Sequence, residues 1–422
     1  MSVRLLVVLT LALAMRDVSL AQGGSNYSSF GLGDFRRQPG GLYEGMGGTS
    51  IAMPTIHGIN LTNPALAGMS PLTRLQVGYR FDQRSVTDGS QTLNQNNGSI
   101  DGIIGSFGVD TALGIGITFG LEPTTSVDYA STKSLYAATP GDTVKGTSFR
   151  RGEGGISSIV LGASVRLTGR LYVGMNLRSL VGTITMYDQV SIIESPFSNS
   201  TRIDTVRYNL QQAKSHEIRG LIANAGLYWE VLPSLSIGAF ASLRNVPTVR
   251  SSDRIFGVVA EGIALDSTLS SVSTTSLPMT FGFGASWLRG RTRLGLDFET
   301  SDHSGMTVNT TSAVTFTSAL RASLGVMYIG SRQAGASYSE RVGYSAGVTY
   351  QQLPFTYRGA ELQEFSLSAG INFPLGSAAM VDIGISAGQR TSALQGALQD
   401  TFMRLVTTVS IGEQWFRPFA RD

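Results

Sequence analysis

The sequence predicts an all-β protein: a 14-stranded antiparallel transmembrane β-barrel with an N-terminal hatch inside its lumen. Three observations lead to this class. Apolar residues alternate with small or polar ones along most of the chain from residue 73, as in strands with one buried face. The connections between these runs alternate between short turns and long polar loops. Only 14% of residues are charged, yet no apolar run reaches the length of about 18–20 residues that a spanning helix needs.

The composition excludes several classes of protein. The chain has 422 residues and no cysteine, so it can hold neither a disulfide nor a thiolate metal site. Its hydrophobic content of 42% is enough to bury a core, which argues against a disordered chain. The net charge is +3, but no segment concentrates Lys and Arg, so nucleic acid is not expected as a partner.

Residues 1–21 are predicted to be a secretory signal peptide. Arg4 supplies a positive start, Leu5 to Met15 form an apolar run, and small residues precede a cleavage point after Ala21. The alternative is a short buried helix. An exported chain that lacks cysteine, is low in charge and is rich in glycine is expected in the outer membrane of a Gram-negative cell.

Residues 73–416 are predicted to form the barrel, and residues 417–422 a short tail. In lipid every backbone N–H and C=O must be paired within the protein, so a spanning sheet has to close and leave no edge. An even number of strands places both chain ends on the side of the short turns, the periplasm. The predicted strands are 73–84, 99–107, 111–122, 155–167, 171–186, 214–229, 234–249, 276–288, 291–302, 317–329, 341–351, 362–373, 378–390 and 401–416.

The strands and connections differ in how well they fit this scheme. The second strand is the least regular, because Ile103 and Ile104 break its alternation. The connection 330–340 is longer than a short turn should be. Long polar loops are predicted at 85–98, 123–154, 187–213, 250–275, 303–316, 352–361 and 391–400.

The alternation also assigns faces to the residues. Leu296 is assigned to lipid, where an Arg would cost roughly 2–4 kcal/mol, and its neighbour Asp297 to the lumen. Aromatic residues near strand ends on the apolar face fit the membrane interfaces. They are Tyr79, Trp287, Tyr344, Tyr350 and Trp415. A soluble propeller or sandwich is the alternative, but no repeat of about 40–50 residues is present, and a sandwich does not explain the loop pattern.

Residues 22–72 precede the barrel and are too rich in Gly and Pro for membrane strands. They are also apolar, which favours a hatch that folds into the lumen; a mobile periplasmic leader is the alternative. Glycine suits close packing and positive φ, and Pro64 restricts Asn63 to extended conformations. The residues expected to shape the hatch are Gly45, Gly47, Gly48, Asn63, Pro64 and Ala65.

Two parts of the chain resemble a known family. Gly45-Met46-Gly47-Gly48 and Asn63-Pro64-Ala65-Leu66 are similar to the hatch of the long-chain fatty acid transporter (FadL-type) outer-membrane superfamily, of which this chain looks like a divergent member. Segments 341–347 and 370–375 and the closing Trp415-Phe416 are similar to the C-terminal part of such proteins. The resemblance implies fourteen strands around a small hatch and passive movement of hydrophobic molecules. Related barrels serve type IX secretion.

Two functions therefore stay open. The first is a hatch-gated passive transporter of fatty-acid-like or other lipophilic compounds, with outer-membrane lipid and a hydrophobic small molecule as partners. The second is an accessory or docking barrel of a type IX-like secretion system, which contacts a secreted or surface protein and carries no small molecule. The inward apolar residues expected to bind a ligand are Leu180, Ile222, Tyr228, Phe240 and Met327; the alternative is that they pack against the hatch.

Catalysis is not expected, and neither a cofactor nor a metal is predicted. The three histidines, His57, His216 and His303, are scattered without ligand spacing. Asp302-His303-Ser304 has the residue types of a hydrolytic triad, but adjacent side chains in a loop cannot take up triad geometry. A solvated loop is expected there instead. Glycine pairs such as Gly282 and Gly284 lack the helix that a dinucleotide site needs.

Overall fold

A computed structural model describes most of the chain after the predicted signal peptide. The described residues are 24–55, 58–87, 92–139, 142–194, 197–198, 201–202, 206–260, 263–333, 335–376, 379–392 and 399–413. The predicted signal peptide (residues 1–21), the tail (417–422), Trp415 and His57 lie outside them.

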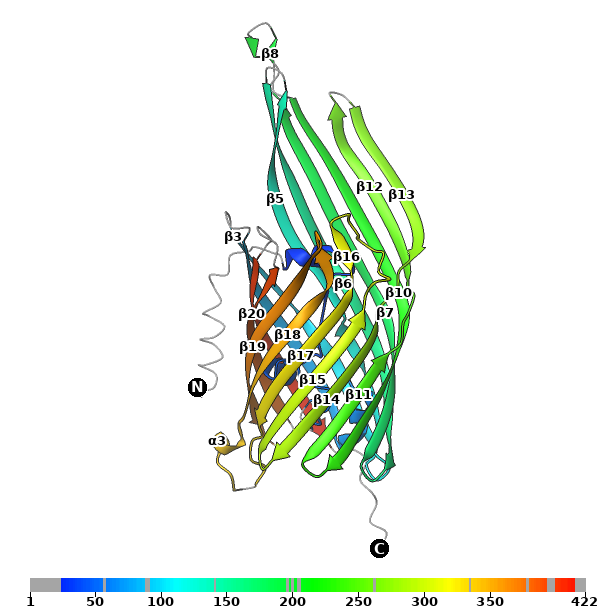
Figure 1. Ribbon diagram of the computed structural model, residues 1–422, viewed down its shortest axis with the longest axis vertical. Helices are drawn as coiled ribbons and strands as arrows, with labels where there is room; N and C mark the ends of the chain where they lie inside the picture. Colours follow the sequence, from blue (N-terminus) through cyan, green and yellow to red (C-terminus); the bar gives the residue numbers. More distant parts are fainter. Residues whose placement is uncertain are drawn as a thin grey trace.

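Fourteen antiparallel strands close into a barrel, as predicted (Figure 1). Each strand pairs with the next, and the last pairs with the first from Thr73–Glu413 to Thr87–Gln399. Each predicted span overlaps one of them. The strands are β2 (Thr73–Thr87), β3 (Thr92–Asp110), β4 (Ile115–Pro123), β6 (Asp142–Thr168), β7 (Leu171–Glu194), β10 (Val206–Leu232), β11 (Leu235–Ser242), β14 (Met279–Arg289), β15 (Thr292–Asp302), β17 (Ser318–Tyr328), β18 (Gly343–Tyr357), β19 (Ala360–Leu375), β20 (Ala379–Ser392) and β21 (Gln399–Glu413).

The two faces of the wall are those that the alternation predicts. Leu296 is 56% exposed on the outside of β15, whereas Asp297 is 2% exposed and points inward. Tyr79, Trp287 and Tyr344 are exposed on the outer face. Because outward apolar side chains are stable only against lipid, this exposed belt marks the surface that faces the membrane.

A β-bulge, together with an inward Ile104 that packs against Ile59 and Leu61 of the hatch, explains the irregular second strand. Gly78 of β2 pairs with Gly102, but Tyr79 pairs with Ile100, so Asp101 is the extra residue of β3. Gly102 takes a positive φ of 141°, which glycine tolerates. Ile100 and Ile103 face outward while Asp101 and Ile104 are buried. The bulge thus turns a carboxylate into the lumen.

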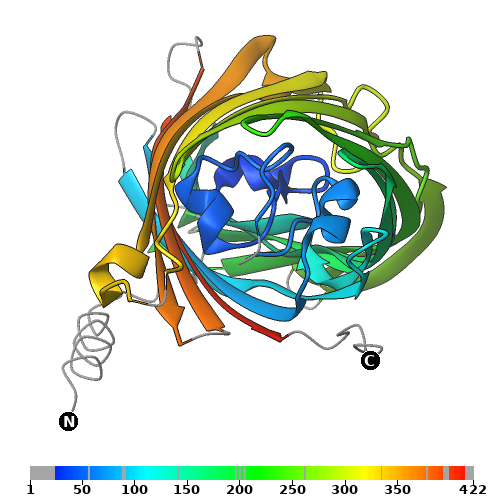
Figure 2. The same ribbon diagram turned by 90° about the horizontal axis from the view of Figure 1, so that it is seen from below.

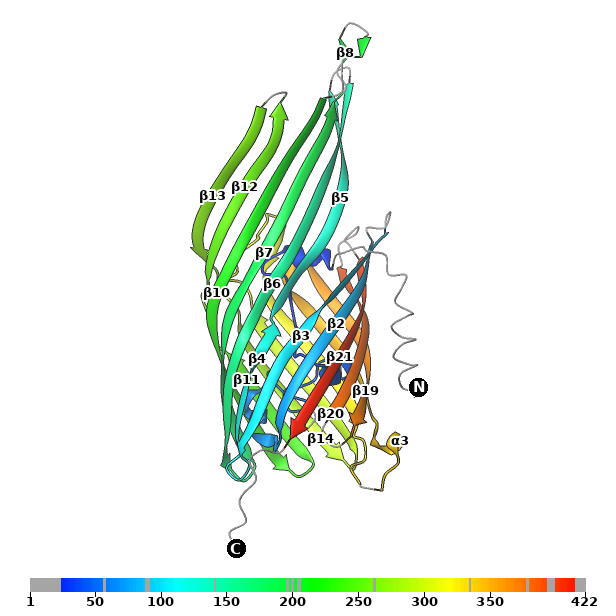
Figure 3. The ribbon, with the colours of Figure 1, turned by 180° about the vertical axis from the view of Figure 1, so that it is seen from behind.

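Most of the predicted long loops are strands, which corrects the sequence interpretation. β5 (Thr125–Thr139), β12 (Thr248–Ala260) and β13 (Ile263–Thr274) join the outer halves of β6, β7 and β10 in a sheet of order β5-β6-β7-β10-β12-β13. The sheet stands above the barrel (Figures 1 and 3). With 27 residues, β6 is about 90 Å long. Two short strands, β8 (Phe197–Ser198) and β9 (Thr201–Arg202), pair beyond it.

The physical reason for the error is that both faces of these extensions meet water. They carry Thr, Ser and Tyr on both sides, so no apolar face marks them as strands. Segments 85–98 and 352–361 are likewise mostly paired strand. Segment 303–316 is mainly irregular, with β16 (Val314–Phe316) paired to β18.

The hatch, of which residues 24–55 and 58–72 are described, lies inside the ring of strands (Figure 2). It contains η1 (Asn26–Ser29), β1 (Asp34–Phe35), α2 (Gly41–Gly45) and η2 (Pro64–Met69). The Gly24 amide donates to the Asp128 carbonyl at 2.8 Å, at the end where the hairpins leave the barrel. Gly68 packs against Gly114, beside the short β3–β4 turn. The hatch therefore runs the length of the lumen. No helix of the described residues is long and apolar enough to cross a membrane.

Candidate functional site

The hatch backbone packs against inward-facing glycines of the wall. At each of these glycines an added methyl group would lie within 3.0 Å of a hatch atom. Several form cross-strand pairs, such as Gly295 with Gly325 and Gly325 with Gly347. We call the set the glycine belt: Gly116, Gly174, Gly226, Gly238, Gly284, Gly295, Gly325, Gly347, Gly370 and Gly384. Since each lies on a different strand, the wall fits the hatch closely on most of its circumference.

The first predicted hatch motif forms a tight turn against β17, β18 and β19. Gly47 and Gly48 have φ of 68° and 75°, a region that favours glycine. The Gly47 carbonyl accepts from Thr349 Oγ1 at 2.6 Å and from Arg321 Nη2 at 3.0 Å. Gly45 touches Gly370 so closely that a side chain would not fit.

The second motif fixes the hatch to itself and to β10. Asn63 Nδ2 donates to the Ile51 carbonyl at 2.8 Å and to the Leu227 carbonyl at 3.0 Å. Its Oδ1 accepts the Ala65 amide at 3.1 Å, which caps η2. Pro64 is the first residue of η2, where its missing N–H is not needed.

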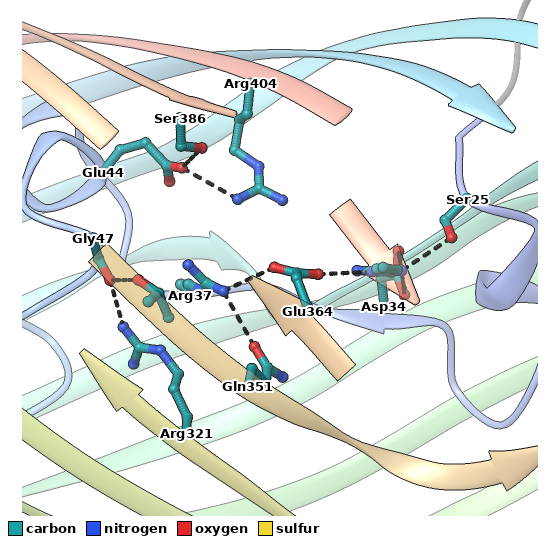
Figure 4. Close-up of polar contacts among 12 residues, drawn as sticks. Ser25, Asp34, Arg37, Glu44, Gly47, Arg321, Gln351, Glu364, Ser386 and Arg404 are labelled. Carbon is teal, nitrogen blue, oxygen red and sulfur yellow. Dashed lines mark hydrogen bonds and ion pairs between the residues drawn. The ribbon is translucent and has the colours of Figure 1, made fainter. Parts of the chain in front are cut away.

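Buried ion pairs join the hatch to β2, β19, β20 and β21. Figure 4 shows the pair of Glu44 with Arg404 and that of Arg37 with Glu364. Glu44 of α2 lies 3.2 Å from Arg404 and 3.7 Å from Arg80, and it also accepts from Ser386. A buried carboxylate would be costly without such partners.

Two further hatch residues extend this network toward the hairpin end. Asp34 pairs with Arg390 at 2.9 Å, and Arg37 pairs with Glu364 at 3.0 Å. Glu364 also accepts from Arg390 at 2.7 Å, so the two ion pairs are linked into one network (Figure 4). The bulge residue Asp101 completes the network by bonding Arg80 Nε at 2.7 Å and the Gly40 amide at 2.8 Å.

A cavity of about 310 Å³ lies between the hatch and the barrel wall. One part of its lining is apolar and the rest is charged. The apolar part includes Leu180, Ile222, Phe240, Leu277 and Phe355. The charged part holds eight arginines, Arg36, Arg37, Arg80, Arg84, Arg178, Arg321, Arg390 and Arg404, against six carboxylates, Asp34, Asp82, Glu122, Asp128, Glu299 and Glu364.

The five residues predicted to bind a ligand fall into two groups. Leu180, Ile222 and Phe240 line the cavity. Tyr228 instead packs with Ala65, Leu66 and Tyr172 and donates to Ser236 at 2.8 Å. Met327 packs with Leu42, Tyr43, Met46 and Met53 of the hatch. These last two occupy the packing role that the sequence left open as the alternative.

The charged lining was missed because each residue is isolated in the sequence. Arg80, Arg84, Arg390 and Arg404 sit singly on lumen-facing positions of three strands. One signal was available. These arginines occupy positions that the alternation assigns to the inward face, and arginines on the inward faces of neighbouring strands indicate a shared site in the lumen.

The sequence predicts a solvated loop at His303, and this is wrong for the histidine itself, which packs against the hatch. Its ring is buried and lies edge-on to Phe35 of the hatch at 5.0 Å. Nε2 lies 2.9 Å from Ser301 Oγ, and Asp302 pairs instead with Arg244 at 3.0 Å. Burial lowers the pKa of His303 to about 4. His216 lies elsewhere, 2.8 Å from Ser251 Oγ.

Solved structures similar to this chain are outer-membrane channels. CymD, a monoaromatic hydrocarbon channel, matches with TM-score 0.60 and 13% identity over 92% of this chain and 100% of its own. A Pseudomonas aeruginosa FadL homologue matches with TM-score 0.59 and 11% identity over 91% of this chain and 100% of its own. The P. putida toluene transporter TodX matches with TM-score 0.56 and 13% identity over 90% and 99%. No curated protein matches the chain.

These likenesses show the fold, that of FadL-like outer-membrane channels, and agree with the resemblance seen in the sequence. A family model adds a more specific relationship over nearly the whole length. The model described as BamG matches residues 1–419. The chain belongs to the BamG family.

Proposed function

We propose that this barrel is a passive outer-membrane transporter whose lumenal cavity takes up an amphipathic lipophilic molecule. The observation that carries the proposal is the divided lining of the cavity. Leu180, Ile222, Phe240, Leu277 and Phe355 offer an apolar wall to the tail of such a molecule. A volume of about 310 Å³ suits a small ligand or one segment of a longer chain.

The charged wall indicates what the polar end would be. Several of the lining arginines are already paired, in part with Glu44, Asp101 and Asp400 behind the cavity surface. The choice of an anionic head therefore rests on the arginine that has no such partner. Arg36 of the hatch is half-buried and donates to Ser99 at 2.9 Å. No carboxylate among the described residues forms an ion pair with it, which makes Arg36 the residue best placed to meet a carboxylate or phosphate head.

Cavity and hatch together define the route in this proposal. The ligand enters from the hairpin end, and it leaves only when the hatch shifts away from the glycine belt. With the short turns on the periplasmic side, β2 begins and β21 ends there. The similar structures named as a monoaromatic hydrocarbon channel and a toluene transporter support lipophilic cargo as a class. No catalytic step is part of the proposal.

Native mass spectrometry of protein purified from outer membranes tests this. A bound amphipathic anion is expected with the wild type, and both Phe240→Asp and Arg36→Gln should reduce its occupancy. Tyr228→Phe is the control, because Tyr228 does not line the cavity. Wild-type protein that carries no small molecule, and takes up none when titrated with palmitate, would contradict the proposal.

One observation favours a second candidate, a docking barrel for a secreted or surface protein. β13 pairs with β12 on one edge, and among the described residues no strand pairs with its other edge. Its side chains from Ala264 to Thr274 are exposed. An exposed strand edge is a template for a strand of another chain. Crosslinking from β13 to a co-purified protein, with an empty cavity, would favour this function instead.

A further inference from the structure

The one long connection at the short-turn end of the barrel forms a small structure outside the wall. Residues 329–342 link β17 to β18 and contain α3 (Tyr338–Arg341). Seen from the short-turn end, this gold segment lies outside the ring of strands, on the opposite side of the wall from the lumen (Figure 2). We call residues 329–342 the outer loop. Its position places it beside the membrane surface and away from the cavity.

Specific contacts hold the outer loop in shape. Arg291, on the neighbouring β14–β15 turn, donates to the Ile329 carbonyl at 2.9 Å and to the Glu340 carbonyl at 2.7 Å. Its guanidinium also lies over the ring of Tyr328, 4.7 Å from the centroid. The Ser331 amide donates to the Glu340 carbonyl at 2.7 Å. These contacts give the outer loop a defined structure at the short-turn end of the barrel.

A recess of about 270 Å³ opens between α3 and the β19–β20 turn. It is lined by Tyr338 and Arg341 on one side and by Pro374, Leu375 and Gly376 on the other. The lining thus combines a guanidinium with apolar and aromatic surface. Such a combination suits a molecule with an anionic group joined directly to hydrocarbon.

The exposed charge at this end of the barrel is positive. Arg341 lines the recess, Arg332 is exposed in the same loop, and Arg289 is exposed at the end of β14. The one acidic residue of the loop, Glu340, is engaged by Ser337, whose backbone amide and hydroxyl donate to it at 2.7 and 2.8 Å. These hydrogen bonds lower the pKa of Glu340, so its charge is tied to the loop's own capping box.

The recess is continuous with the lipid-facing surface. Tyr328 and Tyr344 are cross-strand partners at the foot of β17 and β18, and both are exposed on the outer face. Leu375, at the end of β19, is also exposed. Aromatic residues at this level belong to the headgroup zone of a barrel, so the recess begins where acyl chains end and phosphates start.

We propose that the outer loop is a binding site for one glycerophospholipid of the membrane leaflet on the short-turn side. Arg341 holds the phosphodiester, Arg332 adds positive charge from the same loop, and Leu375, Pro374 and Tyr338 contact the glycerol and the first methylenes of the acyl chains. The site does not depend on the lumenal cavity, so it stands or falls separately from the transport proposal. It anchors this rim of the barrel at a fixed depth.

Native mass spectrometry of the delipidated full-length protein, titrated with palmitoyl-oleoyl phosphatidylglycerol, tests the site. The wild type should bind one lipid before the non-specific series begins. The variant Arg332→Gln/Arg341→Gln should bind it at least about tenfold more weakly, because charge-assisted hydrogen bonds are lost. Leu375→Ser should weaken binding through the apolar half and leaves both arginines in place.

The matched control is Arg166→Gln/Arg170→Gln at the β6–β7 turn, which removes two arginines from the same end of the barrel. It should leave lipid binding unchanged. Band shift on heating in SDS confirms that each variant is folded. Equal weakening by the control, equal binding by the Arg332→Gln/Arg341→Gln variant, or stronger binding of lipid A than of phosphatidylglycerol would each overturn the proposal.

Discussion

The carboxylate of Asp297, on β15, accepts the backbone amide of Ser50, in the hatch, at 2.6 Å. The same oxygen accepts the Ile51 amide at 2.9 Å. The preceding residue, Leu296, points to lipid. Of these two adjacent residues, Asp297 therefore holds the hatch and Leu296 faces the membrane. Substitutions at the two positions should have different consequences.

Leu296→Arg should impair insertion, because an arginine on the lipid face costs roughly 2–4 kcal/mol near mid-bilayer. Asp297→Asn should insert normally and loosen the hatch, since an amide oxygen accepts more weakly than a carboxylate. The fraction of heat-modifiable protein in the membrane measures insertion, and hydrogen exchange at Ser50 and Ile51 measures the hatch. Normal insertion of Leu296→Arg would show that the assigned faces are reversed.

The glycine belt predicts that one methyl group is enough to disturb the hatch. Gly347→Ala would bring its methyl against Met46 and Gly47, and overpacking of this kind costs typically about 1–3 kcal/mol. We expect a lower band-shift temperature and faster proteolysis within the hatch. Gly169→Ala is the matched control, because no atom lies within 4 Å of the added methyl there. Equal effects at the two glycines would argue against close contact at the belt.

Glu44→Gln should destabilise the barrel, because it leaves the buried Arg404 and Arg80 with one carboxylate fewer. Asp82 and Asp101 still pair with these arginines at 2.8 and 2.7 Å, so we expect a loss of about 1–3 kcal/mol rather than that of a stranded charge. Asp266→Asn is the control, since its pair with Arg254 is exposed to water and should matter little. Band-shift temperatures of the two variants make the comparison.

His303 predicts a dependence of stability on pH. Burial lowers its pKa to about 4 from the ordinary value of about 6.5. Between these values the unfolded chain binds the proton and the folded chain does not, so stability falls as pH falls from 6.5 toward 4 and is unaffected by this group above 6.5. His303→Leu should show a smaller drop of the band-shift temperature in that window. Parallel curves for the two proteins would mean that His303 is not buried as a neutral ring.

Removal of residues 40–70 should open the lumen. The strand ladders do not include these residues, and fourteen strands enclose more space than their own side chains fill. In planar bilayers the intact protein should conduct little, and the deletion variant should conduct in large steps. Low conductance of an inserted deletion variant would indicate that other segments close the lumen; porin-like conductance of the intact protein would count against the hatch.

The strands of the barrel could be predicted because one face meets lipid and the other the lumen, so each carries a period of two. Even the bulge at Asp101 left a trace, because Ile100 and Ile103 both face outward although they are three residues apart. The hairpin extensions gave no such signal. Leu269 and Val272 of β13 are both exposed although they lie on opposite faces. Since both faces of this strand meet the same solvent, its apolar and polar residues do not alternate.

The lumenal site was only partly predictable for a related reason. Inward apolar residues such as Phe240 can be found from alternation, but alternation does not give their height along the barrel axis. Phe240 meets the cavity and Met327 meets the hatch. Glu44 bonds to Ser386 and Arg404, which lie more than 300 positions away in the sequence. Only the stagger of the strands in the closed barrel brings such residues together, and the sequence pattern does not give that stagger.

The course of the hatch through the lumen also imposes an order on biogenesis. Gly24 lies at the hairpin end and Gly68 beside a short turn, while the belt leaves no clearance between the two surfaces. A ring that had already closed could not admit this segment from one end. The seam between β2 and β21 joins the first strand to the last, so it forms only after the whole chain has been made. Until then the hatch must lie against a sheet that is still open. Pairing of β2 with β21 then closes the barrel around it.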